Sequence, residues 1–91
     1  MSGDYGCARQ RIDRWLWHAR LVRTRGAAAA LAGGGFVRVN GVRIDAPGRM
    51  VRTGDVITVA LDRRVRVVKV IGFVERRGPA RMAAALYEDL Q

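Results

Sequence analysis

The sequence has very few of the side chains on which catalysis and metal binding usually depend. Its 91 residues include one cysteine, one serine and one histidine, namely Cys7, Ser2 and His18. A single cysteine excludes an internal disulfide and a cysteine-rich zinc site, and a single histidine excludes a histidine pair as metal ligands. The aspartates are scattered, with no spacing that brings two carboxylates together for acid–base catalysis. We therefore expect no enzymatic activity, no cofactor and no bound metal.

Long apolar runs are also missing. No stretch approaches the ~20 apolar residues that a membrane-spanning helix requires. The first residues, Met-Ser-Gly-Asp-Tyr-Gly, lack the basic and then apolar order of a signal peptide. The length suits one domain only. We expect a cytoplasmic, monomeric protein that does not contact membranes.

Positive charge is what the sequence has in excess. Seventeen Lys and Arg residues against eight Asp and Glu give a formal net charge of +9, and only Lys69 among the seventeen is not arginine. Residues 1–25 and 63–91 each carry a net charge of +4, whereas residues 26–62 carry +1. So large an excess in so small a domain favours a polyanionic partner. The sequence leaves open whether the two basic segments fold onto one face.

Apolar periodicity predicts two helices in the first third of the chain. The first begins at Arg11, and its apolar positions recur at three- and four-residue spacing. These positions are Ile12, Trp15, Leu16, Ala19 and Val22. Residues 24–26 break the pattern, residues 27–32 predict a short alanine-rich helix, and the three glycines at 33–35 end it.

Several residues of the first helix have distinct expected roles. Trp15 falls on the apolar stripe and is expected in the core. Trp17 points about 200° away on a helix and is either a stacking platform for a base or a contact of the C-terminal segment. Asp13 lies between two arginines and is expected to order them. His18, a lone histidine on a basic helix, is expected at the surface or half-buried.

The rest of the chain predicts short strands and a last helix. Asn40-Gly41 between β-branched runs is typical of a type I′ hairpin turn, because both turn positions need positive φ. Residues 56–61 and the valine-rich run 65–74 are expected to form an antiparallel pair. Pro79 suits the first position of a C-terminal helix, with apolar residues at four-residue spacing. The apolar residues of that helix are Met82, Leu86 and Leu90. This order of elements predicts an α+β domain.

The residues around the two helices and the hairpin also supply binding chemistry. Guanidinium groups suit bidentate phosphate contacts and base stacking. A hairpin tip can also present exposed backbone groups to phosphates. The candidates are Arg11, Arg14, Arg25 and Arg38, with Asn40 and Gly41 at the tip.

This pattern resembles a known domain over about fifty residues. The motifs that carry the resemblance are Arg11-Ile12-Asp13-Arg14-Trp15-Leu16, Thr24-Arg25, Ala28, Leu31, Gly35-Phe36-Val37-Arg38-Val39-Asn40-Gly41, Pro47 and Gly54-Asp55. Together they resemble the RNA-binding domain named after small-subunit ribosomal protein four. The stretches Trp15-Leu16-Trp17, Glu75-Arg76-Arg77-Gly78-Pro79-Ala80 and Ala85-Leu86-Tyr87-Glu88 are similar to the heat shock protein fifteen family of bacterial ribosome-associated proteins.

The resemblance implies two N-terminal helices packed on a small antiparallel sheet, with a short C-terminal helix. Residues 1–8 would be a flexible tail, residues 9–61 the RNA-binding domain, and residues 62–91 a family-specific strand and C-terminal helix packed on the same domain. The first two helices and the hairpin would face the RNA. The implied contacts are Arg11, Arg14, Arg20, Arg23, Arg25, Arg38 and Asn40, with Asp13 orienting them.

The resemblance also implies a task and partners. The partners are ribosomal RNA and the large ribosomal subunit, stalled with a nascent chain still attached to tRNA, whose rescue or recycling the protein would aid. Gly26 stands where most relatives have a serine that would cap the second helix, and glycine there costs only about a few tenths of a kcal/mol. The chain stops at Gln91, short of the Lys/Arg-rich tail of many relatives, so we expect lower affinity and salt dependence.

Two other functions are compatible with the sequence. The same module occurs in RNA-modifying enzymes such as pseudouridine synthases and RNA methyltransferases, so the chain could be an accessory RNA-binding module. It could also be a basic DNA-binding protein that uses residues 12–22 and 27–32 as a helix-turn-helix. An alanine helix that ends in three glycines is a poor reader of the major groove, whereas nonspecific DNA binding agrees with the charge.

Overall fold

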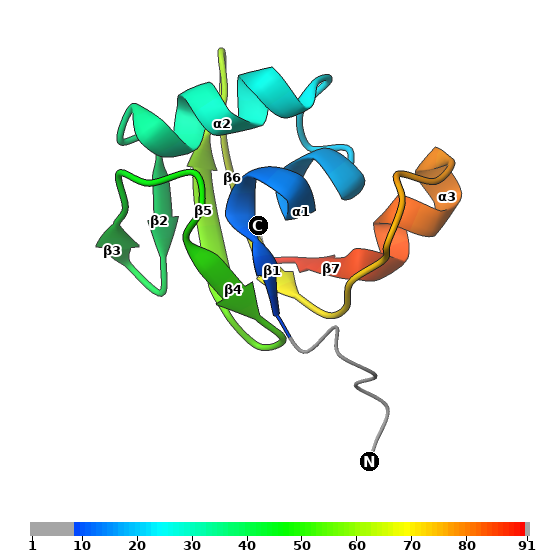
Figure 1. Ribbon diagram of the computed structural model, residues 1–91. Helices are drawn as coiled ribbons and strands as arrows, with labels where there is room; N and C mark the ends of the chain where they lie inside the picture. The colour runs from blue at the N-terminus through cyan, green and yellow to red at the C-terminus, as the bar shows by residue number, and fades with distance from the viewer. Residues whose placement is uncertain (1–8, 91) are drawn as a thin grey trace.

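The computed structural model describes residues 9–90 and contains short strands, two N-terminal helices and a short C-terminal helical segment (Figure 1). The elements are β1 (Arg9–Arg11), α1 (Ile12–His18), α2 (Arg25–Gly33), β2 (Val37–Val39), β3 (Val42–Arg43), β4 (Met50–Arg52), β5 (Val56–Ala60), β6 (Val65–Val70), α3 (Ala80–Ala83), the 3₁₀ turn η1 (Ala84–Leu86) and β7 (Tyr87–Asp89). The expected α+β class is confirmed. The predicted tail, residues 1–8, lies outside the described residues.

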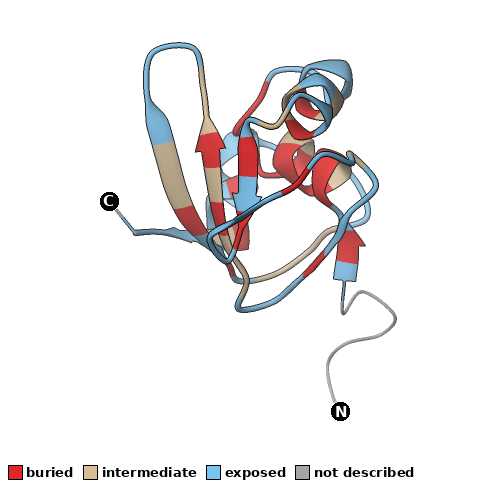
Figure 2. Cartoon of the chain, turned by 90° about the vertical axis from the view of Figure 1, so that its left-hand side faces the viewer, coloured by how far each residue is buried: buried red, intermediate tan, exposed pale blue. Residues whose placement is uncertain are grey.

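Five of the strands form one antiparallel sheet in the order β3-β2-β5-β6-β7, and β1 pairs separately with β4. In β2, Val37 and Val39 are buried and Arg38 is exposed, and the β5 partners of the two valines, Val59 and Ile57, are buried as well. Because side chains alternate along a strand, the sheet has one apolar inner face. The helices α1 and α2 lie over this face, where the buried residues gather (Figures 1 and 2). They add Trp15, Leu16, Ala28 and Ala32 to the core.

The hairpin forms as predicted. Asn40 and Gly41 have φ values of 52° and 82°, as a type I′ turn requires. The Asn40 side chain fastens the tip to the start of β5, because its Oδ1 accepts from Val56 N at 2.8 Å and its Nδ2 donates to Asp55 Oδ1 at 3.1 Å. Two side-chain hydrogen bonds therefore hold the hairpin tip against the start of β5.

The first helix ends earlier than its apolar periodicity predicts. Arg20 takes a φ of 60°, and its N–H donates to Trp17 O at 3.1 Å. The next N–H, of Leu21, donates to Leu16 O at 3.1 Å. These two bonds form a Schellman motif, which ends a helix with a left-handed residue that is usually glycine. The prediction of a helix to Val22 is therefore wrong, although both Leu21 and Val22 stay buried.

The N-cap of the second helix lies two residues before Gly26, the position at which the sequence predicted it. Thr24 is the N-cap, and its Oγ1 accepts from Ala27 N at 3.0 Å. Gly26 lies inside the first turn of α2 and caps nothing. Threonine is a good N-cap, so replacing the relatives' serine by Gly26 leaves the helix start with its hydrogen bond.

The C-terminal region differs most from the prediction. Only residues 80–86 are helical, and β7 then pairs with β6, with Tyr87 opposite Val70. Met82 and Leu90, expected on the buried side of one helix, are 55% and 44% exposed. The helix through Leu90 is wrong because the free edge of β6 supplies backbone hydrogen bonds to residues 87–89.

Candidate nucleic-acid interface

A buried carboxylate organises the start of the helical region. The Asp13 side chain is only 4% exposed, yet it lies beneath two guanidinium groups that are about half exposed. Arg11 donates to it through Nε at 3.1 Å and Nη2 at 3.0 Å, and Arg25 Nη2 lies 3.9 Å from its Oδ1. The same Oδ1 accepts from Arg14 N at 2.7 Å. We call Arg11, Asp13 and Arg25 the Asp13 cluster.

The Asp13 cluster joins residues from three elements, because Arg11 ends β1, Asp13 begins α1 and Arg25 begins α2. Two-point binding of a carboxylate fixes a guanidinium plane, so Arg11 is held with part of its surface free for a ligand. The sequence predicted that Asp13 orders arginines. Chain neighbours suggested Arg11 and Arg14, and the family resemblance also included Arg25. In the structure the Asp13 carboxylate lies near Arg11 and Arg25, whereas the Arg14 side chain is directed elsewhere.

The Arg14 side chain binds the second basic segment. Its Nη2 donates to Glu75 O at 2.8 Å, and Arg20 Nε donates to Gly78 O at 2.8 Å. Arg77 reaches in the opposite direction, donating from Nε to Trp17 O at 3.0 Å and from Nη2 to Val22 O at 3.4 Å. The sequence could not place the two basic segments relative to each other, and the structure packs residues 75–78 of the second against the first.

These contacts settle the two alternatives for Trp17. The Arg77 guanidinium carbon lies 5.5 Å from the centroid of the Trp17 ring, within the range of a cation–π contact. Trp17 is a contact of the C-terminal segment. Trp15 is fully buried, as predicted, and its Nε1 donates to Gly72 O at 3.0 Å.

A groove of about 550 Å³ runs along the connection between α1 and α2. We call it the connection groove. Its basic side chains are Arg20, Arg23 and Arg77, and Leu61 and Asp62 from the β5–β6 turn also line it. The remaining lining residues are Leu21, Val22, Ala27 and Leu31. Guanidinium groups beside apolar side chains suit a phosphate backbone with its sugars and bases. Sequence reasoning did not find the role of Arg77, although the basic loop around it was visible.

The hairpin residues lie apart from these groups. Arg38 is exposed on the outer face of the sheet, opposite Arg43 of β3, whereas the helices cover the inner face. Asn40 uses its side-chain oxygen and one amide hydrogen for Val56 and Asp55. The structure therefore brings together Arg11 with Arg25, and Arg20 with Arg23, but does not bring Arg38 to them.

His18 is buried rather than at the surface, so that expectation is wrong. Its exposed fraction is 2%, and its Nδ1 has no hydrogen-bond partner among the described residues. Burial lowers the pKa of His18, and the positive charges of Arg14, Arg25 and Arg77 act in the same direction, against a hydrogen bond with the Val74 backbone. The imidazole is therefore neutral at pH 7.

Two further kinds of feature are relevant among the described residues, namely metal-binding clusters and membrane-spanning helices. Between residues 9 and 90, no group of three or more His, Cys, Asp and Glu side chains is placed to hold a metal ion. No helix in the same range is long and apolar enough to cross a membrane.

Comparison with known proteins places the chain in a family. A family model of the S4 domain matches residues 10–57. Heat shock protein 15 of Escherichia coli (strain K12) is 39% identical over 79 residues, covering 87% of this chain and 59% of the relative. The Heat shock protein 15 homolog of Aeromonas salmonicida is 40% identical over 81 residues, covering 89% of this chain and 61% of the relative.

A solved structure agrees in fold. The trimeric structure of Vibrio cholerae Heat Shock Protein 15 superposes with a TM-score of 0.83 at 32% identity, covering 89% of this chain and 81% of that one. The chain spans about three fifths of the length of the curated relatives that it matches. The motifs, the fold and the matched residues lead to one conclusion: the chain belongs to the S4 domain family and, within it, to the heat shock protein 15 family.

Proposed function

We propose that this protein binds ribosomal RNA without catalysing a reaction on it. The observation that carries the proposal is the Asp13 cluster, in which one buried carboxylate positions two half-exposed guanidinium groups from different elements. Membership of a family whose domain is named after a ribosomal protein agrees with it. Arg14, Arg20 and Arg23 extend the surface toward the connection groove.

Binding would depend on phosphate positions and on the shape of the RNA. The deep, narrow groove of an A-form helix cannot be read by side chains, so proteins contact its phosphates and 2′-hydroxyls. Guanidinium groups held at fixed separations suit such contacts. Arg38 would contact a phosphate that reaches past the hairpin, and Asn40 would act chiefly by holding the hairpin tip.

The family resemblance extends the proposal to a particular target. That target is the large ribosomal subunit stalled with a nascent chain attached to tRNA, and binding would aid its rescue or recycling in the cytoplasm. Sucrose-gradient sedimentation of cell extracts tests this. We expect the protein to sediment with the large subunit, and more of it when translation is stalled. Recovery only at the top of the gradient would reject this target.

The RNA-binding surface is tested by a matched pair of variants. Arg25→Gln removes a charge from the Asp13 cluster, and Lys69→Gln removes one from the outer face of the sheet, where Lys69 pairs with Glu88. With purified large-subunit ribosomal RNA, Arg25→Gln should weaken binding and lower the slope of log K against log salt by about 0.7 to 0.9. Equal affinity of Arg25→Gln and the unchanged protein would remove Arg25 from the surface.

The expected monomer is tested separately. The Vibrio cholerae relative is described as trimeric, and we propose that this chain binds RNA as a monomer. Sedimentation equilibrium at several concentrations measures the mass directly. A mass near 10.0 kDa supports the monomer, and three times that mass rejects it.

A further inference from the structure

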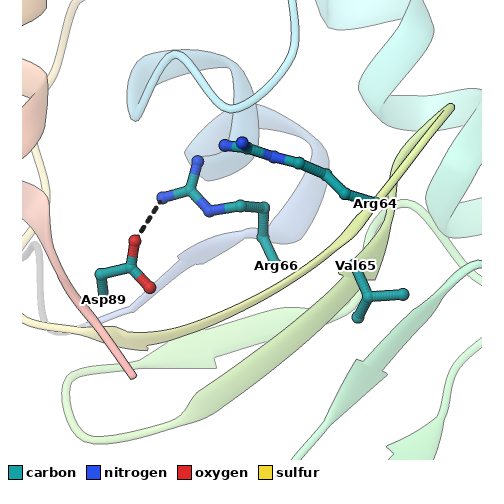
Figure 3. A pocket seen from close by; sticks show the side chains of 4 residues that line it. All are labelled: Arg64, Val65, Arg66 and Asp89. Atoms are coloured by element: carbon teal, nitrogen blue, oxygen red, sulfur yellow. Dashed lines mark hydrogen bonds and ion pairs between the residues drawn. The ribbon is translucent and has the colours of Figure 1, made fainter. Parts of the chain in front are cut away.

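A second basic site lies where strand β6 begins. Arg64, Val65 and Arg66, together with Asp89 of β7, line a cavity of about 260 Å³ (Figure 3). Arg66 lies in β6, and Arg64 directly precedes the strand, two residues from Arg66. Figure 3 shows the guanidinium groups of Arg64 and Arg66 extending toward the same side, next to each other.

One of the two guanidinium groups is firmly held. Arg66 Nη2 donates to Asp89 Oδ2 at 3.0 Å, and the Arg66 guanidinium carbon lies 5.7 Å from the centroid of the Tyr87 ring. Its side chain is only 17% exposed. The pKa of Arg66 is raised, chiefly by its interaction with Tyr87 and to a smaller extent by its interaction with Asp89. Arg66 is thus a fixed positive charge at the side of the cavity.

Arg64 adds a second positive charge to the cavity. Within residues 9–90, no acidic side chain lies within ion-pair distance of its guanidinium. Its backbone is anchored, because Arg64 O accepts from Leu61 N at 2.8 Å across the turn. Two guanidinium groups and one carboxylate leave one net positive charge at the cavity, which suits a singly charged phosphodiester.

The position of this site connects it with the surface already described. Arg66 pairs with Val59, a residue of the apolar inner face, so Arg66 and Arg64 project from the side of the sheet that α1 and α2 cover. The turn that precedes Arg64 contributes Leu61 and Asp62 to the connection groove. The connection groove and this site are therefore joined through the β5–β6 turn, whose residues 61–66 contribute to both.

We propose that Arg64 and Arg66 bind a backbone phosphodiester of the same RNA that contacts the Asp13 cluster and the connection groove. This rests on the proposed RNA-binding function and gives the second basic segment a direct part in it. Arg64 supplies the free guanidinium, and Arg66, oriented by Asp89 and Tyr87, supplies the fixed one. A phosphodiester contact is independent of base identity, so the site adds affinity without adding sequence preference.

The test compares two exposed arginines at opposite ends of the β5–β6 hairpin. Arg64→Gln removes the free guanidinium at the turn of this hairpin. Arg52→Gln removes one positive charge near its other end, because Arg52 precedes residues 53–55 and Gly54 N donates to Val70 O at the end of β6. Both variants should keep the melting temperature of the unchanged protein. With large-subunit ribosomal RNA, Arg64→Gln should lower the salt slope by about 0.7 to 0.9, the loss of one phosphate contact, and Arg52→Gln should not.

Each outcome decides the proposal. An Arg64→Gln slope equal to that of the unchanged protein, or an equal decrease in Arg52→Gln, overturns it and leaves the proposed function intact. Failure of the unchanged protein to bind the RNA overturns both. A last experiment uses inorganic phosphate and follows the NMR signal of the Arg64 guanidinium in the unchanged protein. If phosphate shifts this signal while Arg64→Gln has the same RNA salt slope as the unchanged protein, the site binds free anions and the RNA contact is rejected.

Discussion

The Asp13 cluster and the connection groove hold their arginines in different ways. In the Asp13 cluster, a buried carboxylate binds Arg11 and lies near Arg25, so it positions charge and also offsets part of it. In the connection groove, carbonyl oxygens hold Arg20 and Arg77. A carbonyl group orients a guanidinium without cancelling its charge, so in the groove these contacts hold Arg20 and Arg77 without offsetting them, and Asp62 is the one carboxylate among the lining residues.

The two regions also differ in what they require of the rest of the chain. The three members of the Asp13 cluster lie between residues 11 and 25, and their backbone is anchored by residues 47–50, through the pairing of Arg11 with Met50 and the bond from Asp13 N to Pro47 O. The connection groove also needs residues 75–78, which contact the first helix although they are about sixty residues away from it in the sequence. The groove should therefore be lost when the C-terminal segment is disturbed, whereas the Asp13 cluster should persist.

Removing the buried carboxylate should have the largest effect on stability. Asp13→Ala breaks the two bonds from Arg11 and the bond from Arg14 N, so we expect a loss of about 2 to 3 kcal/mol, or roughly 10 °C or more in Tm. RNA affinity should fall although the net charge becomes more positive, because Arg11 and Arg25 lose their orientation. Tighter RNA binding at unchanged Tm would mean that Asp13 only offsets charge.

Loss of Arg77 should have a smaller effect on stability and should be confined to the connection groove. Arg77→Ala removes the bonds to Trp17 O and Val22 O and the contact with the Trp17 ring, at a cost of about 1 to 2 kcal/mol. Arg77→Lys keeps the charge but cannot reach both carbonyl oxygens with a planar fork. Urea denaturation and RNA titration of both variants separate the two roles. If the lysine variant matches the unchanged protein in both measurements, charge alone accounts for Arg77.

The sequence predicted those parts of the fold that short stretches determine by themselves. Asn40-Gly41 has a local requirement for positive φ, and the turn formed where that requirement placed it. The end of α1 gave no such signal, because Arg20 occupies a left-handed position that glycine usually fills. The strand at 87–89 depends on pairing with β6, and a pattern read along one segment does not contain that partner.

The same distinction holds for the candidate site. The role of Asp13 in orienting arginines could be predicted because Arg11 and Arg14 are its neighbours in the chain. The roles of Arg77 and Arg66 depend on Trp17 and Asp89, which are distant in sequence and become neighbours only through the fold. From the sequence, the second basic segment was either a second RNA contact or a solvated surface. Which backbone groups its arginines contact is determined by the packing of the folded chain.

A still smaller effect is expected when the pH falls. Burial lowers the pKa of His18 in the folded protein below its ordinary value of 6.5, which applies to the unfolded chain. The unfolded chain therefore binds more protons as the pH drops, so stability should be constant above about pH 7 and should decrease below 6.5. Urea denaturation at pH 7.5 and 5.5 measures this. His18→Gln should show less of the decrease, and an equal decrease in the variant would assign the effect to other groups.

The smallest change in stability should come from the residue that ends α1. Arg20→Gly relieves the left-handed strain, worth about 1 to 2 kcal/mol. It loses about as much in total, because glycine gives the unfolded chain more freedom and the exposed hydrogen bond to Gly78 O is removed. We expect Tm to change little while RNA affinity decreases, because the connection groove loses a guanidinium. Arg20→Ala loses the same bond but keeps a Cβ at positive φ, so it should be less stable than Arg20→Gly. Equal stability of the two variants would show that the left-handed position costs nothing here, and unchanged RNA affinity in both would remove Arg20 from the binding surface.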